Sequence, residues 1–246
     1  LLGLLVAGAT GCGPSEEDDN REPSADTGVR QDDTLADSGF GNDSSTDAGD
    51  GTDTAHDPQK PVTEEGRHLV GYREWDITYQ ARADGTDDER KLNISVWYPR
   101  ESPPRGEVNV PAHYSNIFFQ SYVADKAPLL EEGEFPVLVF SHGNGAMAEQ
   151  SFFMTEFWAT HGWVVVAPDH TGNTFRTGTD IDLQAATYRP QDVSALIDHL
   201  RNLPDDSPFK GRLTDDLVLS GHSFGAVTTV ANSGATFAVD ELKTEC

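Results

Sequence analysis

Three continuous apolar runs, at residues 137–140, 163–167 and 217–219, constrain the fold of this chain more than any other feature. None of them alternates apolar with polar side chains, so each predicts a strand that is buried on both faces. Two earlier segments, 73–79 and 91–98, also favour strands, and the second alternates as a half-buried strand does. The Asp-Gly turn sequence between them predicts an antiparallel hairpin at one edge of the sheet.

The segments that follow the apolar runs have helical character. Residues 147–160 predict a helix that Gly162 ends in the C′ position. Pro190 suits the first turn of a second helix, and residues 224–231 begin a third. An apolar stripe at helical spacing supports the second helix, formed by Val193, Leu196, Ile197, Leu200 and Leu203. Buried strands that alternate with helices predict an α/β fold, with a mostly parallel sheet covered by helices on both faces.

A Pro-rich connection at residues 99–135 separates the hairpin from the first buried strand. It contains an apolar patch at residues 116–122 in otherwise polar surroundings. The patch fits a lid or acyl-binding element and a short buried helix equally well, and both alternatives stay open.

The formal charge of −25 is divided between two parts of the chain. Residues 13–65 hold 16 acidic residues, three basic residues and one aromatic residue, which predicts a disordered acidic linker. The linker is rich in oxygen ligands but lacks the spacing of known calcium loops, which favours a plain tether over a calcium site. Residues 66–246 are expected to carry the globular domain. A chain this acidic is not expected to bind nucleic acid.

The first twelve residues resemble the end of an export signal. Residues 1–9 are apolar and too short for a transmembrane helix, but they fit the apolar region of a secretory signal. Ala9-Thr10-Gly11-Cys12 follows and resembles a bacterial lipobox, in which the cysteine is acylated. We therefore expect residues 1–12 to be part of a signal peptide, with Cys12 lipidated and the protein anchored to a membrane of the bacterial cell envelope. A secreted protein with an ordinary signal peptide is the alternative.

The candidate nucleophile is Ser223, within Gly221-His222-Ser223-Phe224-Gly225. This Gly-x-Ser-x-Gly pattern lies between a predicted strand and a predicted helix, which is the setting of a nucleophile elbow. Gly221 and Gly225 would permit the sharp turn and the close packing around it. The start of the following helix would place its positive dipole end under the serine hydroxyl.

A second glycine-bracketed loop follows the first buried strand, with the sequence Ser-His-Gly-Asn-Gly at residues 141–145. Acyl transfer needs two backbone N–H donors directed at the oxyanion of the tetrahedral intermediate. Phe224, the residue after the nucleophile, would provide one of these donors. Asn144, in the second loop, is the candidate for the other.

The order of these motifs resembles the α/β-hydrolase superfamily. Within the superfamily it is most similar to the platelet-activating-factor acetylhydrolase-like and dienelactone-hydrolase-like esterases of bacteria. The resemblance covers residues 66–246 and includes Arg-x-x-Asp at residues 189–192 besides the two glycine-bracketed motifs. It implies an α/β-hydrolase fold and hydrolysis of a carboxylic ester, with a short acyl chain on a lipid among the candidate substrates.

The general base of such an enzyme is not apparent. In this superfamily the triad follows the order serine, acid, histidine, but no histidine follows His222. Asp240 resembles the cap of a helix, and His142 and His170 are expected to support loops rather than to take a proton. We therefore expect the printed sequence to end before the triad is complete. The strand at 217–219 would then be a bare apolar edge, so the 246-residue chain is expected to aggregate and to be inactive.

These features together predict a serine esterase that acts on a small ester or lipid through an acyl-enzyme on Ser223. Polyester or cutinase-like hydrolysis is an alternative within the same fold. A surface lipoprotein that uses the hydrolase scaffold only for binding is another. No Cys/His cluster has metal-ligand spacing and no dinucleotide-binding or Walker loop is present, so no metal or cofactor is expected.

Overall fold

The computed structural model describes residues 64–83, 85–115, 118–177 and 183–235. All of these residues lie in one compact unit, Gln59–Phe237. A second unit, Leu1–Pro58 with Ala238–Cys246, lies outside the described residues. The predicted signal peptide with Cys12, the acidic linker up to residue 63, and Asp240 therefore all lie outside them.

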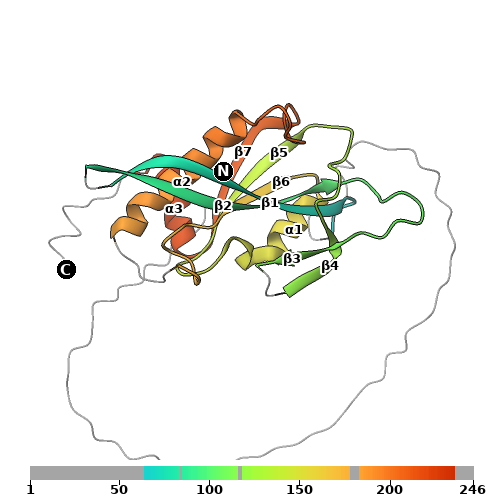
Figure 1. The fold of residues 1–246 in the computed structure, drawn as a ribbon, viewed down its shortest axis with the longest axis horizontal. Coiled ribbons are helices and arrows are strands. Elements are labelled where there is room, and N and C mark those ends of the chain that lie inside the picture. Colours follow the sequence, from blue (N-terminus) through green and yellow to red (C-terminus); the bar gives the residue numbers. More distant parts are fainter. Residues whose placement is uncertain (1–63, 84, 116–117, 178–182, 236–246) are drawn as a thin grey trace, which may run out of the picture. The chain divides into compact units, whose positions relative to one another are not determined.

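The described unit is built on a seven-stranded sheet in the order β3-β4-β1-β2-β6-β5-β7 (Figure 1). The predicted hairpin is present as β1 (Leu69–Ala83) and β2 (Thr86–Arg100), which pair antiparallel over their whole length. Its predicted place at an edge is wrong, because β4 pairs with β1 on one side and β6 pairs with β2 on the other, so the hairpin lies inside the sheet. The three apolar runs are the cores of β5 (Phe135–Ser141), β6 (Val164–Pro168) and β7 (Leu213–Gly221). These three strands are parallel, while β2 pairs with β6 antiparallel, so the sheet is mixed and its parallel part ends at the candidate site.

Helices cover both faces of this sheet. The predicted helix over 147–160 is a 3-10 turn, η1 (Ala148–Ser151), followed by α1 (Phe152–Thr160), and Gly162 follows it with φ of 92°. On β5, Val137 and Val139 pack into one buried cluster and Leu138 and Phe140 into another. Because successive strand residues point to opposite faces, the two clusters lie on opposite sides of the sheet.

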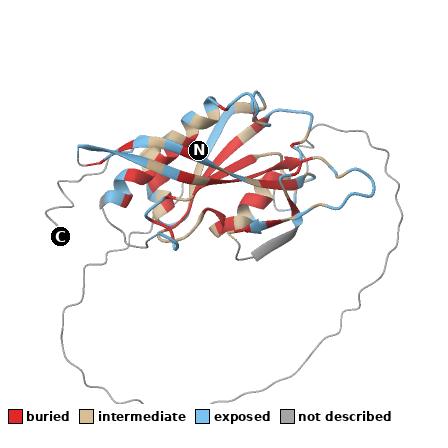
Figure 2. Ribbon diagram, viewed as in Figure 1, coloured by how far each residue is buried: buried red, intermediate tan, exposed pale blue. Residues whose placement is uncertain are grey.

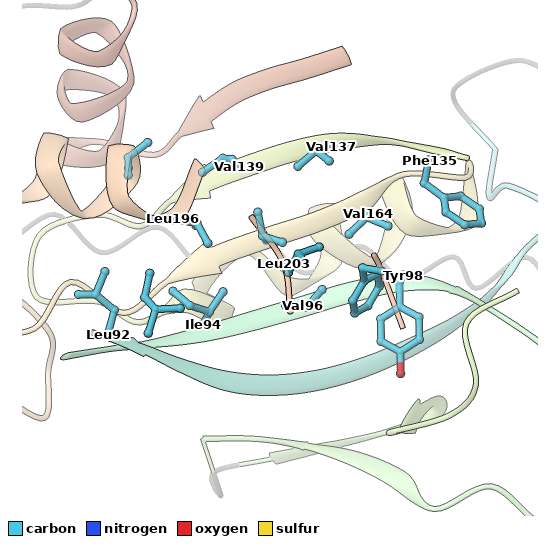
Figure 3. Close-up of a cluster of buried hydrophobic side chains, with 14 of the residues drawn as sticks. Leu92, Ile94, Val96, Tyr98, Phe135, Val137, Val139, Val164, Leu196 and Leu203 are labelled. Carbon is cyan, nitrogen blue, oxygen red and sulfur yellow. The ribbon is translucent and has the colours of Figure 1, made fainter. Parts of the chain in front are cut away.

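The first cluster receives α2 (Leu183–Arg201), through Val193 and Leu196 (Figure 3). The second cluster receives α1. A third helix, α3 (Phe224–Asn232), packs against β7, β5 and α2. The central strands β5 and β6 are consequently buried along nearly their whole length (Figure 2). At their carboxyl ends both strands lead into the loops that form the candidate site.

Other sequence expectations also differ from the structure of this unit. Of the two alternatives for the apolar patch at 116–122, the short buried helix is wrong, because the described part of the patch belongs to β4 (Phe118–Asp125), which pairs with β3 (Pro111–Tyr114) and adds to the sheet beside β1. The lid or acyl-binding element stays a prediction. Residues 116–117 lie outside the described residues. The second helix does not begin at Pro190, since α2 begins at Leu183 and Pro190 lies inside it. The preceding turn remains helical because its side chains Tyr188 and Arg189 are buried against the rest of the unit.

The strand β7 lies at one end of the sheet, beside β5 alone. Its apolar side chains Leu217 and Val218 are 37% and 42% exposed, so β7 is not buried on both faces as its composition suggests. In the part of the chain that the structure describes, β7 is thus the exposed apolar edge that the sequence predicts for an unpaired strand. Among the described helices, none has both the length and the apolar character required to cross a membrane.

Candidate active site

The centre of the candidate site is the sharp turn between β7 and α3. Ser223 has φ of 53° and ψ of −119°, a left-handed conformation that costs a non-glycine residue about 1–3 kcal/mol. Gly221 and Gly225 allow this turn, because neither has a Cβ and the neighbouring backbone packs closely against both. A Cβ on Gly221 would lie 2.4 Å from the carbonyl group of Gly225, and a Cβ on Gly225 would lie 1.9 Å from the Ser141 carbonyl oxygen. The turn is therefore fixed against the end of β5.

Ser223 is exposed, and its side chain makes no hydrogen bond with the described residues. The next residue, Phe224, begins α3, so its N–H has no acceptor within the helix. The hydroxyl of Ser223 and this N–H are thus adjacent at the positive end of the α3 dipole. Such an arrangement can stabilise negative charge that develops on a group bound beside the serine.

The loop after β5 lies directly beside this turn. Gln150, in η1, joins the two: its Oε1 accepts a hydrogen bond from Gly143 N at 2.7 Å, and its Nε2 lies 2.9 Å from His222 Nδ1. Gly143 N is therefore occupied. Asn144, the predicted second oxyanion donor, is the next residue and is half-buried, and Gly145 follows with φ of 62°. The structure thus brings Asn144, Ser223 and Phe224 into two loops in direct contact.

Beneath these loops lies a buried group with the connectivity of a catalytic triad, at Ser141 rather than Ser223. Ser141 Oγ is 2.8 Å from His170 Nε2, and His170 Nδ1 is 2.9 Å from Asp192 Oδ2. All three residues have no exposed surface. Asp192 also forms an ion pair with Arg90 at 2.9 Å and accepts a hydrogen bond from Tyr79. This group is inaccessible to a substrate, so its function is to hold the loops.

The two buried histidines are neutral. Burial lowers the pKa of His170 to about 4 and that of His142 to about 2. Their hydrogen bonds agree with one proton each. His170 Nδ1 faces the Asp192 carboxylate while its Nε2 faces a hydroxyl, and His142 Nδ1 faces the Gly143 carbonyl while its Nε2 accepts from His170 N. As expected from the sequence, both histidines support loops.

Arg189 and Asn173 were not among the predicted site residues, although the Arg-x-x-Asp motif already singled out Arg189 and Asp192. Arg189 is buried under the loop after β5 and donates to the His142 carbonyl and, at 2.6 Å, to Asn173 Oδ1. Asn173 comes from the loop after β6, which the sequence gives no reason to select. Within the described residues, no group of histidine, cysteine and acidic side chains is suited to hold a metal ion.

The strand order, the turn at Ser223 and the helices on both faces define an α/β-hydrolase fold. Consistent with this, the chlorophyllase family model matches residues 125–243, slightly under half of the chain. Among solved structures, the chain is similar to a ferulic acid esterase from Streptomyces cinnamoneus, with a TM-score of 0.56 and 19% sequence identity.

This match covers 70% of the chain, which spans only 58% of the length of the esterase. A comparison with curated proteins finds no match. The predicted fold class and the α/β-hydrolase resemblance are confirmed.

Proposed function

We propose that this protein is a serine hydrolase that cleaves carboxylic esters, with Ser223 as the nucleophile. The observation that carries the proposal is the left-handed turn at Ser223, at the start of α3, with an exposed hydroxyl. Backbone strain of this kind persists where the surrounding structure enforces it, and it is concentrated at functional sites. The ester class is supported by the similarity to a structure named as an esterase.

In the proposed reaction, Ser223 Oγ attacks the carbonyl carbon of the ester and loses its proton to a base. The N–H groups of Phe224 and Asn144 stabilise the oxyanion of the tetrahedral intermediate, and each such donor contributes about 10²- to 10³-fold to the rate. Collapse of the intermediate breaks the carbon–oxygen bond to the alcohol, which leaves with a proton, and the acyl group remains on Ser223. Water then attacks the acyl-enzyme, releases the acid and restores the serine.

We assign the base to none of the described histidines. His142 and His170 are buried and fully engaged in the group beneath the loops. His222 is next to Ser223, but its Nδ1 faces the amide of Gln150. The position of the base is measurable, because the pH dependence of kcat/KM reports the pKa of the essential base in the free enzyme.

A fluorophosphonate probe tests the nucleophile directly. We expect the full-length protein to be labelled at Ser223 and the Ser223→Ala variant to lose labelling. Ser233→Ala is the matched control, because Ser233 is an exposed serine at the other end of α3 whose hydroxyl donates to the Thr229 carbonyl oxygen. Labelling of a different residue, or none, would contradict the proposal and favour a scaffold that only binds its ligand.

We also propose that Cys12 carries the lipid that anchors the protein to a bacterial envelope membrane. The support is the sequence Ala9-Thr10-Gly11-Cys12 between an apolar segment and an acidic linker. Metabolic labelling with an alkyne fatty acid is expected to mark the protein and to be lost in Cys12→Ser. The other cysteine, Cys246, provides the control, since Cys246→Ser should remain labelled. A protein that is unlabelled and released into the medium would contradict the anchor.

A further inference from the structure

Arg189 is a buried side chain, only 1% exposed, that contacts both loops of the candidate site. It donates to the His142 carbonyl oxygen and to Ser141 Oγ, the latter at 3.1 Å. On the elbow side, its guanidinium carbon lies 4.8 Å from the centre of the Phe224 ring. The same planar group therefore contacts the residue that opens α3 and the loop that carries Asn144.

A short chain of hydrogen bonds extends from Arg189 to Asn144. Arg189 Nη1 donates to Asn173 Oδ1 at 2.6 Å, and Asn173 Nδ2 donates to Asn144 Oδ1 at 2.7 Å. A guanidinium can only donate, so the amide oxygen of Asn173 must face Arg189 and its NH₂ group must face Asn144. The orientation of the Asn144 side chain is thus fixed by Arg189 through one intermediate residue, which is itself 1% exposed.

The charge of Arg189 is not balanced by a carboxylate in contact with it. Among the described residues, no carboxylate oxygen lies within 4.0 Å of its guanidinium, and Asp192, the nearby acid, is paired with Arg90 and His170. Burial lowers the pKa of Arg189 to about 10, so the group is still protonated at neutral pH. Buried cations are ordinarily paired because desolvation is costly. Here the unpaired cation lies directly beneath the two loops where negative charge would develop.

We propose that Arg189 is a positioning residue for the oxyanion hole. Its planar guanidinium, with several N–H donors in fixed directions, holds the N–H groups of Phe224 and Asn144 in one geometry. The inference rests on the proposed serine hydrolase activity. It goes beyond that activity because it assigns to one buried side chain the alignment of donors from two separate loops. The planar guanidinium is essential to this function, since lysine has the same charge but cannot reproduce several fixed donor directions.

The test uses the full-length protein with p-nitrophenyl acetate. We expect Arg189→Met to lower kcat by about 10²-fold, as for the loss of an oxyanion donor, with KM changed less than threefold. We expect Arg189→Lys to recover less than tenfold of this loss. Affinity for a trifluoromethyl ketone, which forms the tetrahedral adduct, should fall in parallel with kcat/KM.

Arg212 provides the matched control. Its guanidinium likewise donates to backbone carbonyls, of Leu130 and Gly133, and lies 5.5 Å from the centre of the Phe135 ring, at the opposite end of β5. Arg212→Met should lower thermal stability without lowering kcat. If Arg189→Met does not fold, Asn173→Ala interrupts the relay while leaving the cation in place, and it should lower kcat about tenfold.

The outcomes separate this inference from the proposed function. A wild-type protein that is labelled at Ser223, together with full activity in both Arg189→Met and Asn173→Ala, would overturn the inference alone. Wild-type kcat in Arg189→Lys, or an equal loss in Arg212→Met, would also overturn it. A wild-type protein that neither turns over esters nor reacts with the fluorophosphonate would overturn both. A loss of kcat in Arg189→Met that Arg189→Lys largely shares and that Arg212→Met does not share supports positioning by the planar guanidinium.

Discussion

Two serines at the ends of neighbouring strands have opposite environments. Ser141, at the end of β5, has no exposed surface and lies 2.8 Å from a histidine that in turn contacts an aspartate. Ser223, after β7, is exposed and held in a left-handed conformation, and its side chain has no hydrogen-bond partner among the described residues. Ser141 thus has the hydrogen bonds of a catalytic triad but is inaccessible to a substrate. Ser223 is accessible but has no histidine partner among the described residues.

The difference shows that triad connectivity alone does not identify a nucleophile. The Ser141 hydroxyl donates to His170 Nε2 and accepts from Arg189, so its hydrogen-bonding capacity is used structurally. A substrate carbonyl cannot reach it. Ser223, by contrast, is at a helix start, where a developing oxyanion is stabilised by backbone N–H groups and the dipole. The conformation and accessibility of the serine are therefore the more informative features.

Exchanging the two serines for alanine gives the largest expected effect. Ser223→Ala should reduce ester hydrolysis by roughly 10⁴-fold or more, as for the loss of a catalytic serine. Ser141→Ala should retain activity within about tenfold but lower the free energy of unfolding by about 1–3 kcal/mol, because His170 and Arg189 each lose a buried partner. Steady-state kinetics and urea unfolding of both variants measure these effects. If Ser141→Ala were as inactive as Ser223→Ala while folded, the assignment of the two serines would have to be reversed.

The second prediction concerns the contact between the end of β5 at Ser141 and the turn at Ser223. In Gly225→Ala, the new Cβ would lie 1.9 Å from the Ser141 carbonyl oxygen. We expect the turn at Ser223 to move away from the end of β5, with a loss of about 3 kcal/mol or more in the free energy of unfolding and loss of fluorophosphonate labelling. Gly172→Ala is the control, because Gly172 has open space around its Cβ position, so its φ of 87° contributes backbone strain without a steric clash. It should cost only about 1–2 kcal/mol and leave labelling intact.

The sequence allowed the exposed turn at Ser223 to be predicted much better than the buried group around Ser141. Ser223 lies in a local pattern, with glycines at fixed offsets between a strand and a helix, and the backbone geometry follows from that pattern. Asn173 is contributed by a different loop, and its contact with Asn144 depends on how β5 and β6 pair in space. The same limitation explains the error at Pro190, since the burial of Arg189 that favours a continuous helix is a tertiary effect.

The buried group of Ser141, His170 and Asp192 should also make the free energy of unfolding depend on pH. The pKa of His170 is about 4 in the folded state, below the ordinary value of 6.5. The unfolded chain therefore binds a proton below about pH 6.5 that the folded chain does not bind until about pH 4. Stability from this group is fully present at neutral pH and falls as the pH falls through that window, by roughly 3 kcal/mol in total.

The comparison with His170→Gln isolates this group, because other titrating side chains cancel in the difference. The variant should be less stable than the wild type at pH 7, and its deficit should shrink by roughly 3 kcal/mol between pH 7 and pH 4. Urea unfolding at several pH values measures the deficit. A deficit that does not change with pH would mean that His170 titrates normally in the folded protein, and Ser141 would then be a better candidate nucleophile than its burial implies.

The smallest expected effect concerns Gln150, which links the loop after β5 to the elbow. Gln150→Ala removes the acceptor of Gly143 N and the contact with His222, so we expect a loss of about 1 kcal/mol in stability and less than tenfold in kcat. Gln150→Glu keeps an acceptor for Gly143 N but adds a negative charge beside the oxyanion site. If this region stabilises a developing oxyanion, Gln150→Glu must lower kcat more than Gln150→Ala does, although it preserves more of the local structure. Equal kcat values for the two variants at pH 8 would show that no negative charge develops there, and the functional contrast between Ser223 and Ser141 would no longer hold.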